Sequence, residues 1–103
     1  MTDFLFGKDI SGTYISENKS TWGSPCYVIR IDCKTGRWSG VSNDFFGEHR
    51  FPGFVLLPSG FSLKGNILEL QTALVDCGRG QSYIFKVDDG LIYSEKFGTL
   101  RKQ

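Results

Sequence analysis

The sequence lacks the patterns that mark helices, membrane spans and nucleic-acid surfaces. No segment carries apolar residues at helical spacing over three turns, and no apolar run is long enough to cross a bilayer. The charge is nearly balanced, with 12 basic and 11 acidic residues and a formal net charge of +1. Because phosphate backbones are bound by clustered Lys and Arg, this balance argues against nucleic acid as a partner.

Cysteine patterns and targeting signals are also missing. Cys26, Cys33 and Cys77 are odd in number and lack the CxxC spacing of a redox or zinc module. We therefore expect reduced thiols, no metal site and no cofactor. The apolar run within residues 1–8 is too short for a signal peptide and carries an acidic residue early, so we expect a cytoplasmic protein.

What is present is a chain of 103 residues that is 40% hydrophobic and 15% aromatic. That length fits one domain over residues 1–103, which can bury a modest core without disulfides or metals. Apolar and polar residues alternate in segment after segment, as strands require. The predicted strands are residues 9–17, 26–33, 37–42, 61–64, 67–70, 81–87 and 91–97, followed by a closing segment at 100–102.

Turn residues join these strands in chain order. Residues 34–36, 65–66 and 88–90 contain Gly or Asn, which tolerate left-handed backbone, and each predicts a β-hairpin. Residues 43–60 are the exception, because Pro52 and Pro58 argue against a central strand across them. An irregular strand and a short helical lid are the alternatives there.

Many short antiparallel strands without a covering helix must pack as two sheets or close into a barrel. Sequential hairpins favour an all-β fold, a small antiparallel up-and-down β-barrel of about eight strands. The side chains predicted to face inward are Tyr14, Ile29, Ile31, Trp38, Phe61, Leu63, Leu68, Leu70, Tyr83, Phe85 and Leu91.

Both ends of the chain resemble those of lipocalin-like (calycin) barrels. Gly12-Thr13-Tyr14 is similar to the Gly-x-Trp motif of their first strand, with Tyr in place of Trp. Arg101 is placed like the last-strand Arg that packs over that aromatic residue in those families. The resemblance implies a barrel of eight or slightly more strands, closed at one end by cation–π stacking of Tyr14 and Arg101. It does not by itself imply ligand transport.

A barrel of this size is either filled by its own side chains or holds one small ligand. The sequence leaves both open, and the leading hypothesis is a non-enzymatic barrel that binds a small hydrophobic or amphipathic molecule in its lumen. The residues predicted to bind it are Tyr14, Trp38, Phe61, Leu70, Tyr83 and Phe85.

The alternative hypothesis rests on the Phe-rich segment 43–60. Phe45, Phe46, Phe51 and Phe54 form a lid over the open end, an exposed interface, or a satellite core beneath a long loop. If they form an interface, the protein is an interaction module or a symmetric homodimer with no small-molecule ligand.

Catalysis has one candidate cluster, around the single histidine. Asp44, Glu48 and Arg50 flank His49, but neighbouring residues on a strand point to opposite faces, so Glu48 and His49 would not act together. We therefore assign no catalytic residue and expect a protein that is not an enzyme. Similarly, the basic side chains of the strands, Arg30, Arg37 and Lys64, fall on mixed faces and do not form a recognisable basic stripe.

Overall fold

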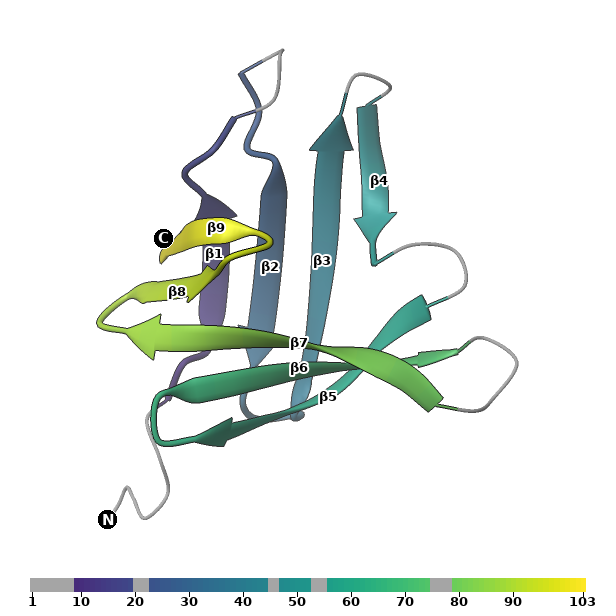
Figure 1. The fold of residues 1–103 in the computed structure, drawn as a ribbon, viewed down its shortest axis with the longest axis vertical. Helices are drawn as coiled ribbons and strands as arrows, with labels where there is room; N and C mark the ends of the chain where they lie inside the picture. Colours follow the sequence, from purple (N-terminus) through teal and green to yellow (C-terminus); the bar gives the residue numbers. More distant parts are fainter. Residues whose placement is uncertain (1–8, 20–22, 45–46, 53–55, 75–78) are drawn as a thin grey trace.

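The computed structural model describes residues 9–19, 23–44, 47–52, 56–74 and 79–103 (Figure 1). Within these ranges the chain forms nine strands, and none of these residues belongs to a helix long and apolar enough to cross a membrane. The strands are β1 (Gly12–Ser16), β2 (Tyr27–Asp32), β3 (Arg37–Asp44), β4 (Gly47–Phe51), β5 (Leu56–Lys64), β6 (Ile67–Leu74), β7 (Arg79–Asp88), β8 (Leu91–Ser94) and β9 (Gly98–Lys102).

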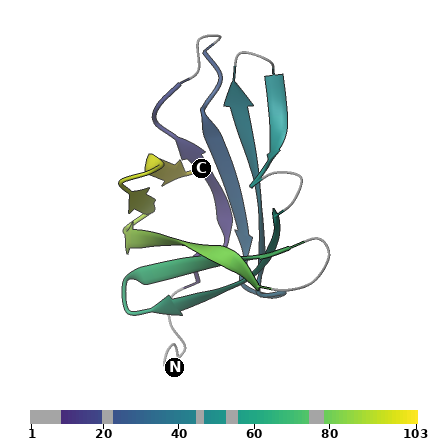
Figure 2. The ribbon, with the colours of Figure 1, turned by 45° about the vertical axis from the view of Figure 1, so that its right-hand side comes forward.

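Eight of the nine described strands close into an antiparallel up-and-down barrel, as predicted. The order around the barrel is β1-β2-β3-β5-β6-β7-β8-β9, and β9 pairs back with β1. The remaining strand, β4, is an extra strand that pairs with β3. Figures 1 and 2 show that β5, β6 and β7 cross β1, β2 and β3 at a steep angle, so the barrel resembles two crossed layers.

Among neighbouring strands of the barrel, β3 and β5 share the fewest registered residue pairs. Because β3 turns its far half toward β4, it meets β5 in register only where Arg37 lies opposite Gly60. Residue Pro58 therefore sits inside β5 without a registered partner on the β3 side, and the register with β6 shifts between Pro58 and Phe61. Proline is tolerated at such a bulge on a free edge. In the described part of residues 43–60 the chain therefore forms strands, namely the end of β3, all of β4 and the irregular first part of β5, and no helix.

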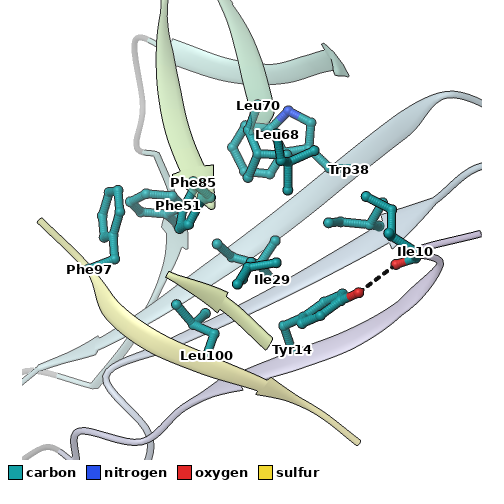
Figure 3. Packing of buried hydrophobic residues seen from close by; sticks show 12 residues of the cluster. Ile10, Tyr14, Ile29, Trp38, Phe51, Leu68, Leu70, Phe85, Phe97 and Leu100 are labelled. Atoms are coloured by element: carbon teal, nitrogen blue, oxygen red, sulfur yellow. Dashed lines mark hydrogen bonds between the residues drawn. The ribbon is translucent and has the colours of Figure 1, made fainter. Parts of the chain in front are cut away.

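Alternation along the strands fills the barrel with apolar side chains (Figure 3). The buried core is Ile10, Tyr14, Ile29, Ile31, Trp38, Phe51, Leu68, Leu70, Phe85, Ile92, Phe97 and Leu100. Among the predicted inward residues, Phe61, Leu63 and Tyr83 are partly buried and pack against this core.

The prediction for β8 was wrong by one residue. Ile92, not Leu91, points into the core, and its side chain is 0% exposed. Asp88 still belongs to β7, opposite Leu91, so the turn is formed by residues 89–90 alone. A shift of one residue in a strand exchanges its two faces, and both candidates are apolar, so the hydrophobic pattern alone did not separate them.

The cation–π pair implied for Tyr14 and Arg101 does not form. Ile15, not Tyr14, lies opposite Arg101, so the two side chains point to opposite sides of the wall. The hydroxyl of Tyr14 donates a 2.8 Å hydrogen bond to the carbonyl of Ile10 inside the barrel. Outside, Nε and Nη2 of Arg101 donate to Oε2 of Glu17 over 3.1 and 2.8 Å. Tyr14 and Arg101 therefore form separate contacts on the two sides of the barrel wall.

Candidate functional site

The predicted ligand-binding residues separate into two regions of the interior (Figure 3). Tyr14 lies beside Ile10 and Leu100, whereas Leu70 and Phe85 lie toward the other aromatic side chains. All five of these side chains belong to the buried core. At these positions the lumen is occupied by the protein's own side chains.

The polar atom of Trp38 is already engaged. Its indole Nε1 donates a 2.8 Å hydrogen bond to the main-chain carbonyl of Gln71 on β6. The register between β6 and β7 shifts just after Gln71, between that residue and Ala73. Trp38 thus links β3 to β6 inside the barrel, and we assign it a role in supporting the barrel.

Six aromatic residues meet in the interior, and we call them the aromatic cluster: Tyr27, Trp38, Phe51, Tyr83, Phe85 and Phe97. Phe97 is the hub, with ring centroids 4.8 Å from Tyr27, 5.1 Å from Phe51 and 5.3 Å from Tyr83. Most of these contacts are edge-to-face, the arrangement that aromatic quadrupoles favour. The sequence analysis assigns Phe97 no ligand role and places it at the end of the predicted strand 91–97.

Only one of the four phenylalanines expected in a lid or interface can be placed. Phe51 is 8% exposed and packs within the aromatic cluster, where its ring lies 5.4 Å from that of Tyr83. Phe51 therefore belongs to the main core of the barrel, and not to a lid, an exposed interface or a separate satellite core. Phe45, Phe46 and Phe54 lie outside the described residues.

The barrel wall is interrupted beside this cluster. β7 pairs with β8 only through residues 86–88, so the described part of β7 before Lys86 has no ladder partner on that side. A pocket of about 340 Å³ fills the interval between β7 and the β8–β9 turn, and we call it the side pocket. It is lined by Gln81, Ser82, Tyr83, Ile84, Ser94, Glu95, Lys96 and Phe97.

Two rings and one cation form the chemical centre of the side pocket. Nζ of Lys96 lies 5.5 Å from the ring centroids of both Tyr83 and Phe97, within cation–π range. Burial, with a smaller contribution from Tyr27, raises the pKa of the Tyr83 phenol above its ordinary value. Tyr83 is therefore neutral near pH 7, and its hydroxyl can donate a hydrogen bond.

A smaller pocket of about 200 Å³ lies at the opposite end, beside Tyr14. Asp9, Asp88 and Asp89 line it together with Lys102. Hydrogen bonds from Ser11 lower the pKa of Asp9. Among the described residues, no three potential metal ligands are grouped closely enough to hold an ion.

The histidine cluster lies at the β3–β4 hairpin. Nε2 of His49 is 3.0 Å from a carboxylate oxygen of Asp44, and both side chains are largely exposed. Cys26 and Cys33 carry free thiols, whereas Cys77 lies outside the described residues. The structure therefore places Asp44 and His49 in a hydrogen-bonded contact at the surface.

Comparison of the chain with protein-family models, with curated proteins and with solved structures finds no match, so its function has to be argued from the barrel itself.

Proposed function

We propose that this protein is a non-enzymatic β-barrel that binds a small amphipathic molecule in the side pocket. The observation that carries the proposal is the interruption of the wall where Tyr83, Phe97 and Lys96 meet. A pocket of about 340 Å³ is within the usual range for small-molecule sites, roughly 300–1,000 Å³. The aromatic cluster behind it supplies an apolar surface that is already rigid.

The lining indicates the chemistry of the ligand. The partly buried ring of Tyr83 and the exposed side chain of Ile84 offer apolar surface to an aromatic or apolar body, and Phe97 packs beneath them. Lys96 offers a positive charge to an anionic group. Glu95 lines the same pocket, which disfavours a ligand with two or more negative charges. The expected ligand is therefore an aromatic monoanion, such as a carboxylate or sulfonate.

This site lies beside the lumen rather than within it. A ligand next to Leu70 or Phe85 would have to displace side chains that are 0% exposed, at the cost of their packing. At the side pocket the space already exists, and Phe85 acts through its stacked contact with Phe97, 5.6 Å between centroids. Of the residues predicted to bind a luminal ligand, Tyr83 lines the side pocket and Phe85 packs behind it, against Phe97.

The experiment is a fluorescence titration with 8-anilinonaphthalene-1-sulfonate, an aromatic monoanion, on the wild-type protein and paired variants. Tyr83→Leu should weaken binding by about two- to tenfold, because a ring contact is worth about 0.5–1.5 kcal/mol beyond the area it buries. Tyr93→Leu is the matched control, because Tyr93 is 47% exposed on β8 and does not line the side pocket. Equal losses in the two variants, or no saturable binding, would refute the proposal.

A second pair tests the charge. Lys96→Gln should weaken binding of the sulfonate, whereas Lys86→Gln, an exposed lysine of β7 outside the pocket, should not. Native mass spectrometry of the purified protein, beside its denatured mass, would then identify a carried ligand. An adduct that is lost on denaturation supports the proposal and gives the mass of the natural ligand.

A homodimer is the second candidate function, and an exposed apolar patch on β6, β7 and β8 favours it. Ile67, Ile84 and Tyr93 are 39%, 53% and 47% exposed on the outer face of these strands. Lys86 lies in register between Ile67 and Tyr93, and Glu69 lies opposite Ile84. A two-fold axis through the patch would bring Lys86 of each copy toward Glu69 of the other, as a self-complementary interface requires.

Light scattering after size exclusion tests this candidate. A dimeric mass that becomes monomeric in Ile84→Ser supports it, and a monomeric wild-type protein at high concentration excludes it. Ile15→Ser is the matched control, because Ile15 lies on β1, outside the patch.

A further inference from the structure

We infer a second binding site, for a phosphate group, on the outer face of β1, β2 and β3. A pocket of about 470 Å³ lies there, and we call it the outer pocket. Its lining residues are Gly12, Thr13, Arg30, Ile31, Asp32, Thr35, Arg37, Trp38 and Ser39. None of them lines the side pocket, so this inference does not depend on the function proposed above.

Strand register brings the two arginines to one place. Thr13 lies opposite Arg30, and Arg30 lies opposite Ser39, in one row across the three strands. Arg37 lies opposite Asp32 in the next row of the same face, because residues two apart on a strand share a face. Arg30 and Arg37 therefore both line the outer pocket.

The strands that carry the two arginines are anchored by packed core side chains. Ile31 and Trp38, which alternate with the arginines along β2 and β3, are each 4% exposed and packed into the core. Trp38 is further held by its hydrogen bond to the Gln71 carbonyl. A site whose side chains start from such anchored strands loses little backbone freedom when a ligand binds.

The two arginines of the outer pocket are not engaged by other side chains of the described residues. Within the described part of the chain, neither Arg30 nor Arg37 forms an ion pair or side-chain hydrogen bond. Asp32 is the only acidic residue of the lining, and its Oδ1 accepts the main-chain N–H of Lys34 at 2.9 Å. Asp32 lies opposite Arg37 and offsets part of the positive charge, so the three charged residues of the lining carry one net positive charge. An anion bound between the two arginines is attracted by both of them.

A phosphate group matches this lining better than a carboxylate does. Each guanidinium presents a planar fork that pairs with two phosphate oxygens, and a phosphate has oxygens enough for both forks. The hydroxyls of Thr13, Thr35 and Ser39 add neutral donors around them. The pocket has room for an organic body beyond the phosphate, so inorganic phosphate and a phosphate monoester share the chemistry that it recognises.

The test is a titration of the ¹⁵N-labelled protein, followed by amide chemical shifts at constant ionic strength. Inorganic phosphate, ribose 5-phosphate and ribose are the three probes. Saturable shifts should centre on the amides of Thr13, Arg30, Thr35 and Ser39 with both phosphates, and ribose should cause none. Tighter binding of ribose 5-phosphate identifies a monoester as the ligand class, whereas equal binding identifies phosphate itself.

Variants make the result specific to the outer pocket. Arg30→Gln and Arg37→Gln should each weaken phosphate binding by about tenfold, since charged hydrogen bonds are lost. Arg50→Gln is the matched control: Arg50 is exposed on β4, opposite Val41, and does not line the pocket. The inference fails if Arg50→Gln weakens binding as much, if the shifts scatter over the surface, or if phosphate does not saturate. Both arginines are exposed, so the dispersed spectra of the variants should show that they remain folded.

Discussion

The indole of Trp38 on β3 donates a 2.8 Å hydrogen bond to the carbonyl of Gln71 on β6, two strands away around the barrel. Between them lies β5, which meets β3 in register only at the pair Arg37 and Gly60. The side-chain hydrogen bond therefore reinforces the barrel where its main-chain ladder is thinnest.

Replacing Trp38 by Phe should destabilise the barrel by about 1–3 kcal/mol, because the Gln71 carbonyl loses its indole donor and the smaller ring leaves space in the core. Urea denaturation at pH 7 measures the change. A loss below about 0.5 kcal/mol would show that water or another donor replaces the indole.

Because Gly80 has no side chain, β7 approaches β6 more closely there than it could with any other residue type at this position. A Cβ at this position would clash with the carbonyl oxygen of Thr72. The Thr72 hydroxyl donates a 2.7 Å hydrogen bond to the carbonyl of Gln81 and accepts a 2.7 Å hydrogen bond from the N–H of Gln81. Gly80→Ala must push these strands apart, and we expect a loss of roughly 1–3 kcal/mol or more in the free energy of unfolding.

The matched control for that variant is Gly60→Ala. A Cβ at Gly60 would first meet the Gln71 side-chain oxygen at 3.4 Å, an ordinary contact with a flexible group. Its stability should therefore change much less. Similar losses in the two variants would contradict the close approach at Gly80.

The fold was predictable because its causes are local. Alternation at period two placed Trp38, Leu70 and Phe85 inside, and turn residues such as those at 65–66 joined neighbouring strands in order. The distinction between Leu91 and Ile92 depended instead on the length of one turn. Where two adjacent residues are both apolar, only the register of the folded sheet decides which one is buried.

The candidate sites depend on non-local relationships that a single sequence does not carry. The side pocket exists because β8 ends at Ser94, whereas the sequence predicted a strand through Phe97. The outer pocket exists because the β2–β3 register sets Arg30 and Arg37 on neighbouring strands of one face. The sequence placed both arginines on mixed strand faces and indicated no basic stripe, because their proximity depends on the strand pairing itself.

The ion pair between Arg101 and Glu17 is expected to matter little for stability. Both side chains are largely exposed, 62% and 49%, and exposed pairs contribute about 0–1 kcal/mol. Arg101→Ala and Glu17→Ala should each cost less than about 1 kcal/mol, with a small coupling in the double-mutant cycle. A loss of several kcal/mol for Arg101→Ala alone would show that Arg101 stabilises the barrel through more than this exposed pair.

Alkaline pH should weaken the barrel through Tyr14. Burial raises the pKa of its phenol above the ordinary value of 10.0, with smaller contributions from Cys33 and Asp9. The folded state therefore keeps the proton more tightly than the unfolded state does, and its hydroxyl donates to the Ile10 carbonyl only while protonated. The resulting stability is fully present below the unfolded pKa and is lost as pH rises through the folded pKa.

Urea denaturation across this range should show a steep decline in the wild type and a shallower one in Tyr14→Phe, which has no phenol to ionise. Because Tyr83 also has a raised pKa, the variant should keep part of the slope. Parallel declines in the two proteins would show that alkaline unfolding begins elsewhere.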